Sequence, residues 1–418
     1  MSLDPYRQVL RLPGVTRLLV LGTVARVAPV AAGIVLTLHV VLTLDSGYAA
    51  AGLVGTATTV GMAVGAPWRG RAIDRVGLRR ALLPSVLAEA VVWSVAPFVG
   101  YRLLLLVSVV GGVLGLPIFT AVRQSLSVLV PEHQRRPAYT MDSIGLELSF
   151  MVGPALGVVV ATTISTRVAV LGVGAAIVLS GVAMMALNPP TRSADLASSS
   201  GPTPRVTGDP PATSRRGWVS APLLAIFAAT AAAAMVLAGT DVAVVAHLRE
   251  TDDVGLTGVV FLAWGVASMS GALVFGAVKK APTSFVLTLV MSLLTIPIGL
   301  ASGPWGLVLA ILPAGALCAP VLTATADAVS RLVPEDVRGE AMGWHGSSLT
   351  IGLAVGAPLA GAAIDGVAPW AGFAAVGLVG LLIGVFGVVA QARQPGRRRR
   401  PGAETMRPVR DPAATLVD

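Results

Sequence analysis

Long apolar runs separated by short polar breaks extend through almost the whole chain of 418 residues. Twelve runs can be bounded by charged residues or by glycine and proline, near 15–44, 48–68, 81–100, 102–130, 139–162, 165–187, 219–246, 254–278, 282–301, 304–330, 341–364 and 367–390. A membrane-spanning helix needs about 20 such residues, and a helix satisfies its own backbone hydrogen bonds in lipid. The pattern therefore predicts an all-α integral membrane protein with twelve spans.

The amino-acid composition agrees with a membrane protein. Hydrophobic residues make up 55% of the chain and charged residues 12%, whereas charged residues are about 25% of ordinary soluble domains. The mean hydropathy of +0.81 comes from the whole length, which favours many spans over a single anchor. The single cysteine, Cys318, lies in an apolar run and the histidines are scattered, so we expect neither a disulfide framework nor a metal site.

The basic residues are distributed asymmetrically between the two ends of the predicted spans. With the N-terminus in the cytoplasm, most of the 30 Lys and Arg residues fall on the cytoplasmic side, and only Arg102, Arg167 and Arg249 fall on the other. The positive-inside rule then predicts a multi-pass protein of the inner (plasma) membrane with both termini in the cytoplasm. These topology signals account for the net charge of +9, so we expect no nucleic-acid partner. The prevalence of arginine over lysine is typical of a GC-rich genome, such as that of an actinobacterium.

The chain divides into two halves that resemble each other. Leu129-Val130-Pro131-Glu132, followed by Arg135, recurs 203 residues later as Leu332-Val333-Pro334-Glu335, followed by Arg338. Such a repeat predicts two pseudo-symmetric six-helix bundles. The expected parts are a first bundle at 1–187, a Pro-, Ser- and Thr-rich disordered cytoplasmic linker at 188–217, a second bundle at 218–391, and a basic cytoplasmic tail at 392–418 whose arginines attract anionic lipid.

A glycine-punctuated basic segment, Gly70-Arg71-Ala72-Ile73-Asp74-Arg75-Val76-Gly77-Leu78-Arg79-Arg80, follows the second apolar run. It resembles the G-x-x-x-D-R-x-G-x-R-R signature that lies between the second and third spans of transporters of the major facilitator superfamily. The resemblance implies a gating loop that latches the cytoplasmic ends of the two bundles in the outward-open state, formed by Gly70, Asp74, Arg75, Gly77, Arg79 and Arg80. Physically, Asp74 can pair with neighbouring arginines or meet the positive N-terminus of a helix from the other half. The alternative is that the arginines are only topology signals.

The equivalent segment of the second half, Gly276–Pro282, keeps a glycine and positive charge but lacks the acid. The predicted latch is therefore asymmetric, with the first-half loop as its principal part.

Ionisable residues inside the predicted spans are costly and therefore candidates for the substrate or proton path. Four are singled out for that path, whereas Glu89, Asp142 and Asp327 are expected to be structural. Arg26, near the midplane of the first span, either binds substrate or holds a nearby carboxylate. Arg123 and Glu147 are predicted at equal depth on consecutive spans, which permits an ion pair. Glu147 is the acid expected to titrate during transport, although a static ion pair explains the same pattern. Asp241 is predicted near the outer boundary of the seventh span, which favours an extracellular gate.

Glycine and proline also recur at corresponding places in the fifth and eleventh spans. Gly153-Pro154-Ala155-Leu156-Gly157 looks like a shortened form of the G-P-x-x-G element found in drug-exporting members of the superfamily, and Gly356 and Pro358 lie at the related place in the second half. Small residues permit close helix packing and proline kinks helices, so packing is the main expected role and an antiport-specific role is the alternative.

The sequence therefore predicts a monomeric secondary transporter that exports a small organic compound, such as a drug, a metabolite or a sugar-like molecule, in exchange for protons. No nucleotide-binding loop of the G-x-x-x-x-G-K-[ST] type occurs, so we expect no cofactor and a proton motive force as the energy source. No nucleophile, base and orienting group stand at interpretable spacing, which argues against an enzyme. Nutrient uptake or facilitated diffusion, and a transporter-like sensor or scaffold that moves nothing, remain alternatives.

Overall fold

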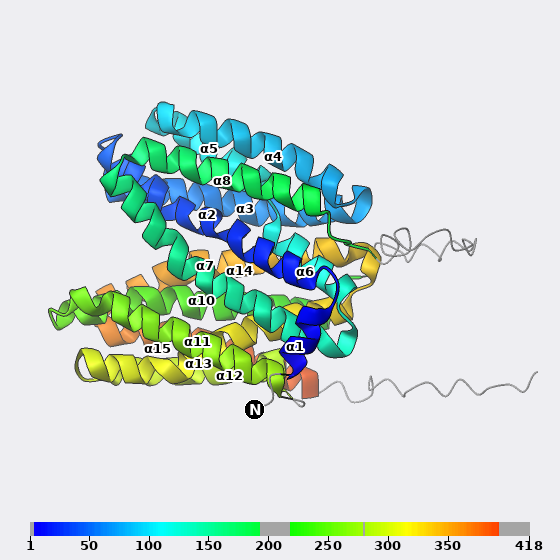
Figure 1. Cartoon of the computed structure of the whole chain (residues 1–418). Coiled ribbons are helices and arrows are strands. Elements are labelled where there is room, and N and C mark those ends of the chain that lie inside the picture. The colour runs from blue at the N-terminus through cyan, green and yellow to red at the C-terminus, as the bar shows by residue number, and fades with distance from the viewer. Residues whose placement is uncertain (1–3, 193–217, 279–280, 393–418) are drawn as a thin grey trace, which may run out of the picture.

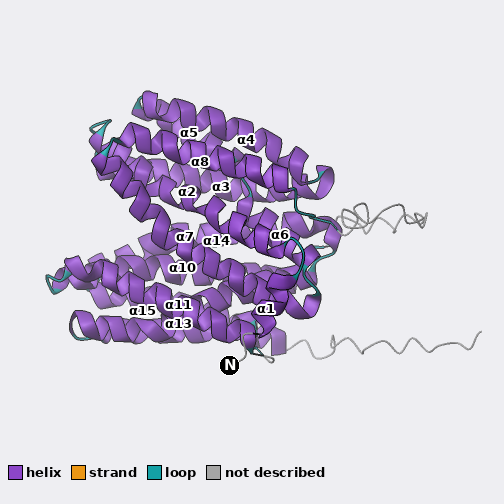
Figure 2. Ribbon diagram, in the orientation of Figure 1, coloured by secondary structure: helices purple, strands orange, loops and turns teal. Residues whose placement is uncertain are grey.

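The computed structural model describes residues 4–192, 218–278 and 281–392, and every regular element within these ranges is a helix (Figure 2). The predicted all-α fold is confirmed. The greater part of the predicted linker, residues 193–217, and the predicted tail from residue 393 onward lie outside the described residues.

The helices follow one another along the chain with short connections. The first half contains α1 (Asp4–Arg11), α2 (Val15–Leu42), α3 (Tyr48–Val76), α4 (Leu78–Val95), η1 (Ala96–Phe98), α5 (Tyr101–Leu114), α6 (Ile118–Leu129), η2 (Glu132–Gln134), α7 (Arg135–Thr163) and α8 (Thr166–Leu187). The second half contains α10 (Ala221–Glu250), η3 (Val254–Leu256), α11 (Thr257–Ala277), α12 (Ser284–Thr295), η4 (Ile296–Leu300), α13 (Gly303–Leu332), η5 (Glu335–Val337), α14 (Arg338–Gly366) and α15 (Pro369–Ala392). Elements labelled η are short 3₁₀ turns.

Eleven helical segments of the described chain are long and apolar enough to cross a membrane. The remaining predicted span, the ninth, at 282–301, is formed by α12 and η4, which together cover only Ser284–Leu300 and are shorter than the others. The span predicted at 102–130 is not continuous, because the backbone leaves the helix between α5 and α6. Gly115 is extended there and Pro117 has no N–H to donate, so the helix is interrupted at these residues.

The two halves form two bundles that lie side by side (Figure 1). Helices α2 to α8 pack with one another, as do α10 to α15, and the main contacts between bundles join α3 to α14 and α7 to α11. The ribbons of the bundles converge at the end where α1 lies and α15 finishes, and diverge towards the other end (Figure 1). We call these the terminal end and the opposite end.

The sequence repeat appears as a structural repeat. Helices α7 and α14 each have 29 residues and start 203 positions apart, each directly after a 3₁₀ turn. Both pack closely on a central helix of their own bundle. A side chain at Gly153 would collide with the backbone of α2, and one at Gly356 would collide with the backbone of α10. Gly157 likewise lies against Val35 of α2, while Pro154 and Pro358 lie inside α7 and α14.

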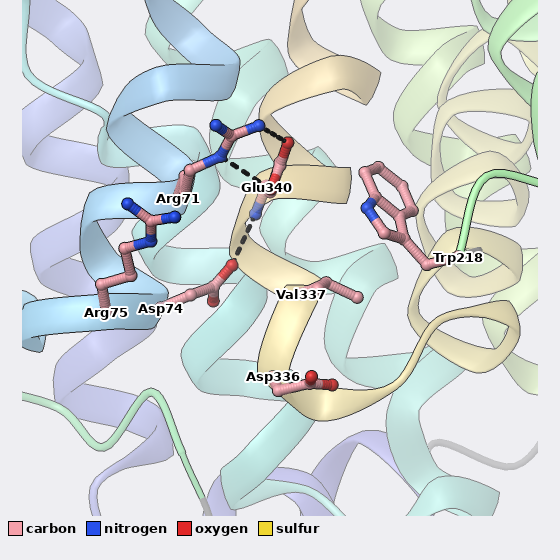
Figure 3. Close-up of a pocket in the computed structure, with 7 residues that line it drawn as sticks. All are labelled: Arg71, Asp74, Arg75, Trp218, Asp336, Val337 and Glu340. Atoms are coloured by element: carbon pink, nitrogen blue, oxygen red, sulfur yellow. Dashed lines mark hydrogen bonds and ion pairs between the residues drawn. The ribbon is translucent and has the colours of Figure 1, made fainter. Parts of the chain in front are cut away.

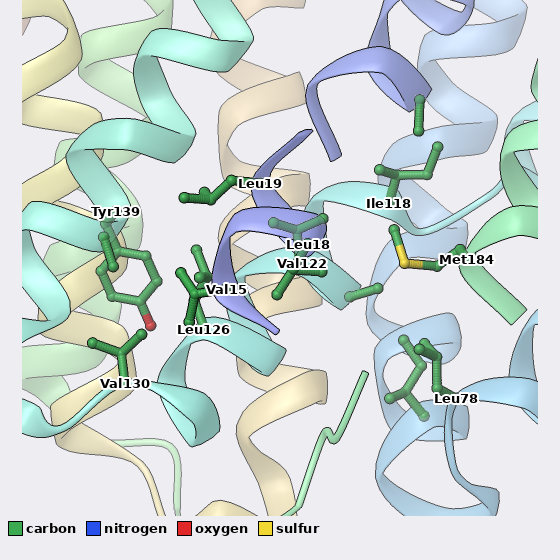
Figure 4. Packing of buried hydrophobic residues seen from close by; sticks show 14 of the residues in the cluster. Val15, Leu18, Leu19, Leu78, Ile118, Val122, Leu126, Val130, Tyr139 and Met184 are labelled. Atoms are coloured by element: carbon green, nitrogen blue, oxygen red, sulfur yellow. The ribbon is translucent and has the colours of Figure 1, made fainter. Parts of the chain in front are cut away.

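A buried apolar cluster fixes the short helix α6 within the first bundle at the terminal end (Figure 4). Val122 and Leu126 of α6 have no exposed surface and pack among apolar side chains of α2, α4, α7 and α8, including Val15, Leu18, Leu78, Tyr139 and Met184. Since apolar side chains lose little by facing lipid, this packing holds α6 by close contact rather than by exclusion of water. It also sets the position of the polar residues that α6 carries, Arg123 and Gln124.

Candidate functional site at the contact between the bundles

Small residues let α3 and α14 cross backbone to backbone near the terminal end. A Cβ atom at Gly70 would overlap the carbonyl oxygen of Gly339, and one at Gly343 would overlap the carbonyl oxygen of Ala66. Four residues after Gly343 along α14, the Ser347 hydroxyl donates a hydrogen bond of 2.6 Å to the carbonyl oxygen of Ala63 in α3. This crossing leaves no room for side chains between the two helices, so it can form only where both are small.

Asp74 lies at this crossing and binds the first turn of α14. Its carboxylate accepts hydrogen bonds from the backbone N–H groups of Gly339 at 2.9 Å and Glu340 at 2.8 Å, and from the side chain of Gln124 at 2.8 Å. The N–H groups of a first helical turn have no partner within their own helix, and the helix dipole favours an anion there. Asp74 of one bundle therefore caps a helix of the other, which is the contact predicted from sequence.

An ion pair, more exposed than the Asp74 contact, lies beside it. The guanidinium of Arg71 donates to both carboxylate oxygens of Glu340, and the Arg71 side chain is 49% exposed (Figure 3). Together they border a cavity of about 170 Å³ at the terminal end, lined by Arg71, Asp74, Arg75, Trp218, Asp336, Val337 and Glu340. Exposed ion pairs stabilise by about 0–1 kcal/mol, so Asp74 is the stronger of the two contacts.

The predicted gating loop is wrong in its local structure. Helix α3 continues to Val76, so Gly70, Asp74 and Arg75 are helical, and the chain turns only at Gly77, which has a φ of 80°. Glycine adopts this left-handed conformation without strain. Arg79 donates to the carbonyl oxygens of Met185 at 2.8 Å and Ala186 at 3.3 Å, so it caps the end of α8 within its own bundle. Arg75 and Arg80 are exposed.

Arg26 and Arg123 share one buried carboxylate, that of Asp142. The ion-pair distances are 2.6 Å from Arg26 and 3.1 Å from Arg123, and the Arg26 and Asp142 side chains are 1% and 2% exposed. The Arg26 guanidinium also lies 4.8 Å from the centre of the Phe119 ring. Arg26 thus holds a nearby carboxylate, one of the two predicted options. The predicted pair of Arg123 with Glu147 is wrong, because Asp142 occupies Arg123.

Glu147 instead faces the second bundle. Its carboxylate accepts a hydrogen bond of 2.7 Å from the Ser268 hydroxyl of α11, and among the described residues no other hydrogen bond or ion pair between bundles lies nearer the opposite end. Asp241 of α10, in the second bundle, is close enough to interact electrostatically with Glu147. Asp241 is exposed, as is Val245 one turn later, although α10 is packed against several helices of its own bundle.

Glu147 and Asp241 are therefore acids of different bundles that lie near enough to interact electrostatically. In the described chain neither carboxylate forms an ion pair. An acid without a fixed counter-charge can take up and release a proton or a cation.

Sequence reasoning expected Asp74 to meet a helix N-terminus of the other half, but it identified neither Gln124 nor the helix, α14. One signal was available for the second: the repeated Pro334-Glu335 pair precedes α14 as Pro131-Glu132 precedes α7, and so indicates a helix start. It also treated Asp142 as a minor structural residue, whereas Asp142 binds two arginines.

Two bundles of membrane-spanning helices that touch through helix ends and carry unpaired acids between them form the architecture of a membrane transporter. The chain belongs to the major facilitator superfamily, whose family model matches residues 18–281 and 279–416. It is a multi-pass membrane protein of a transporter family and not an enzyme.

Solved structures of transporters share this fold. The human organic anion transporter MFSD10 (TETRAN) is 16% identical, with a TM-score of 0.69 over 92% of this chain and 99% of that one. A bacterial homologue of the iron transporter ferroportin in an outward-facing state is 14% identical, with a TM-score of 0.70 over 91% and 99%. The transporter FucP in its outward conformation is 14% identical, with a TM-score of 0.61 over 90% and 98%. A search of curated proteins found no match.

Asp74→Asn is expected to open the terminal end more often and to lower transport, because it removes the charge and one acceptor from the cap of α14. A helix cap or a charged hydrogen bond contributes about 1–2 kcal/mol, which corresponds to a 5–30-fold change in the ratio of the two states. The ratio can be measured as the distance between spin labels at Arg80→Cys and Leu332→Cys in a Cys318→Ala background, with Ile164→Cys and Thr251→Cys reporting on the opposite end.

Arg71→Gln is the matched control for Asp74→Asn. It removes a half-exposed ion pair from the same crossing, so we expect a change below about fivefold. Equal effects of the two variants would contradict the assignment of Asp74 as the stronger contact.

Proposed function

We propose that the protein exports a small organic compound in exchange for protons by alternating access, and that Glu147 and Asp241 carry the proton. The observation that supports this proposal is a pair of neighbouring carboxylates, one from each bundle, neither of which forms an ion pair in the described part of the chain. A proton held between the bundles would be exposed to one side of the membrane in one state and to the other side after the bundles rock.

The proposed orientation in the membrane is inferred from the distribution of charge. The terminal end carries the arginines at 69, 71, 75, 79 and 80 and those at 135, 136, 331 and 338. By the positive-inside rule, this end would face the cytoplasmic side of the plasma membrane. The state described is then closed to the cytoplasm at the crossing of α3 and α14. In the proposed export cycle such a state releases the cargo to the outside and takes up a proton from there.

The proton-coupling role is tested with Glu147→Gln in proteoliposomes. We expect flux driven by a proton gradient to fall at least tenfold, because glutamine still accepts from Ser268 but cannot be ionised. Glu132→Gln is the control, since Glu132 is an exposed acid of the same bundle and should leave coupling unchanged. Gradient-driven flux that survives both Glu147→Gln and Asp241→Asn would overturn proton coupling at this site.

Comparison of energised and uncoupled vesicles separates export from facilitated diffusion. Net movement against a concentration gradient should require the proton gradient and should cease when an uncoupler dissipates it. Unchanged downhill flux in both conditions would instead support a facilitative carrier, and ligand binding without any flux would support a sensor.

A further inference from the structure

The two main contacts between the bundles are related by the repeat, but they are built differently. Thr140 of α7 is the counterpart of Gly343 in α14, 203 residues later. Gly343 lies against Ala66, and α3 continues from there to Val76, far enough to bring Asp74 onto the start of α14. Thr140 lies against Gly276, and α11 ends one residue later, at Ala277. The second contact therefore lacks the helical turns that carry Asp74 in the first.

Helix α1 occupies the second contact. Its buried face consists of Tyr6 and Val9, and it packs against α7 and α11. The Tyr6 hydroxyl donates a hydrogen bond of 2.6 Å to the carbonyl oxygen of Leu273, near the end of α11. A Cβ atom at Gly276 would overlap that hydroxyl, so this glycine is needed for α1 to seat. Because a short connection joins α1 to α2, α1 is part of the first bundle in sequence while it binds the second.

The electrostatic polarity of this contact is the reverse of that at Asp74. In the first contact a carboxylate caps the N-terminal N–H groups of α14. In the second, donors of the first bundle meet the C-terminal carbonyl groups of α11: Arg136 donates to Val278 at 2.5 Å, and its guanidinium lies 5.6 Å from the centre of the Phe275 ring. A cation is favoured at a helix C-terminus as an anion is at an N-terminus.

We propose that α1 is a strap which, with Arg136, forms a second latch on the terminal end and replaces the acidic latch missing from the second half. Tyr6 is its anchor and Gly276 its seat. Partial burial raises the pKa of Tyr6 to about 12, so its hydroxyl remains a donor over the physiological range. The proposal concerns only the equilibrium between the state closed at the terminal end and the state open there. It therefore does not depend on proton exchange as the energy source.

The test uses the full chain and the two spin-label distances defined above. Tyr6→Phe should increase the population open at the terminal end about threefold and Tyr6→Phe with Arg136→Gln about tenfold, since each loses one hydrogen bond. The opposite-end distance should shorten in the same samples. Gln8→Ala, on the exposed face of α1, is the matched control and should leave both distances unchanged.

A second variant tests the whole contact at Gly276. Gly276→Leu should displace both α1 and Thr140 of α7 and open the terminal end at least tenfold, while Gly258→Leu, at an open position of the same helix, should not. Because the two latches lie on different helices, the effects of Tyr6→Phe and Asp74→Asn should multiply. Unchanged distances in Tyr6→Phe/Arg136→Gln and in Gly276→Leu would overturn the proposal.

Discussion

Replacing Gly70 with alanine is expected to force the bundles apart at the terminal end. The added methyl group would overlap the carbonyl oxygen of Gly339, and a helix backbone cannot move aside as a flexible side chain can. Overpacking costs about 1–3 kcal/mol, and a difference of that size between two states changes their ratio about 5–150-fold. The cost falls only on the state in which α3 and α14 cross, so the variant should favour the state open at the terminal end.

Helix α3 supplies two controls for this experiment. Nothing lies within 4 Å of a Cβ built at Gly55, so Gly55→Ala should change neither distance. A Cβ at Gly65 would overlap the carbonyl oxygen of Val113 in the same bundle, so Gly65→Ala should lower the melting temperature without changing the ratio of states. Spin-label distances and thermal melting of all three variants separate the effects. The same response in Gly70→Ala and Gly65→Ala would show that the crossing has no special part in closure.

The sequence predicts the number and approximate bounds of the helices because lipid enforces a simple rule. The backbone in hydrocarbon must form a helix that is long enough to cross. The bounds of the apolar runs therefore predict both ends of α2 and both ends of α8 to within about two residues. The predictions fail where a helix leaves that environment. Helix α3 extends to Val76 through charged residues that resemble a loop, since Asp74 and Arg71 find partners on the other bundle.

The ion-pair partners could not be predicted because counting residues gives depth but not direction. Asp142 and Glu147 are five residues apart on α7, which is only about 7.5 Å in height but about 140° around the helix axis. Asp142 consequently points to Arg26 and Arg123 within its bundle, while Glu147 points to Ser268 in the other. Helix α1 was missed for another reason: it is short and its arginines were interpreted only as topology signals, so nothing indicated that Tyr6 would bind α11.

Asp142→Ala is expected to be the most destabilising single substitution among the charged residues. It would leave the Arg26 and Arg123 guanidinium groups buried together without a counter-charge. Breaking a buried ion pair by removing one partner costs about 3–5 kcal/mol, a large part of the stability of most proteins. We expect a marked fall in the melting temperature of the detergent-solubilised protein and in the folded yield. Glu132→Gln, which removes an exposed partner of Arg331, should cost less than about 1 kcal/mol.

A variant that replaces Arg26, Asp142 and Arg123 together tests whether this cluster only stabilises the fold or also takes part in transport. Exchanging a complete buried ion network for apolar residues of similar size is often neutral or stabilising, because no unpaired charge remains. Arg26→Met/Asp142→Leu/Arg123→Met should therefore recover most of the stability that Asp142→Ala loses. If transport recovers with it, the cluster only holds α2, α6 and α7 together. If the protein folds but transport is absent, the buried positive charge takes part in moving the cargo, and Arg26 and Arg123 must exchange Asp142 for another anion when the bundles rock.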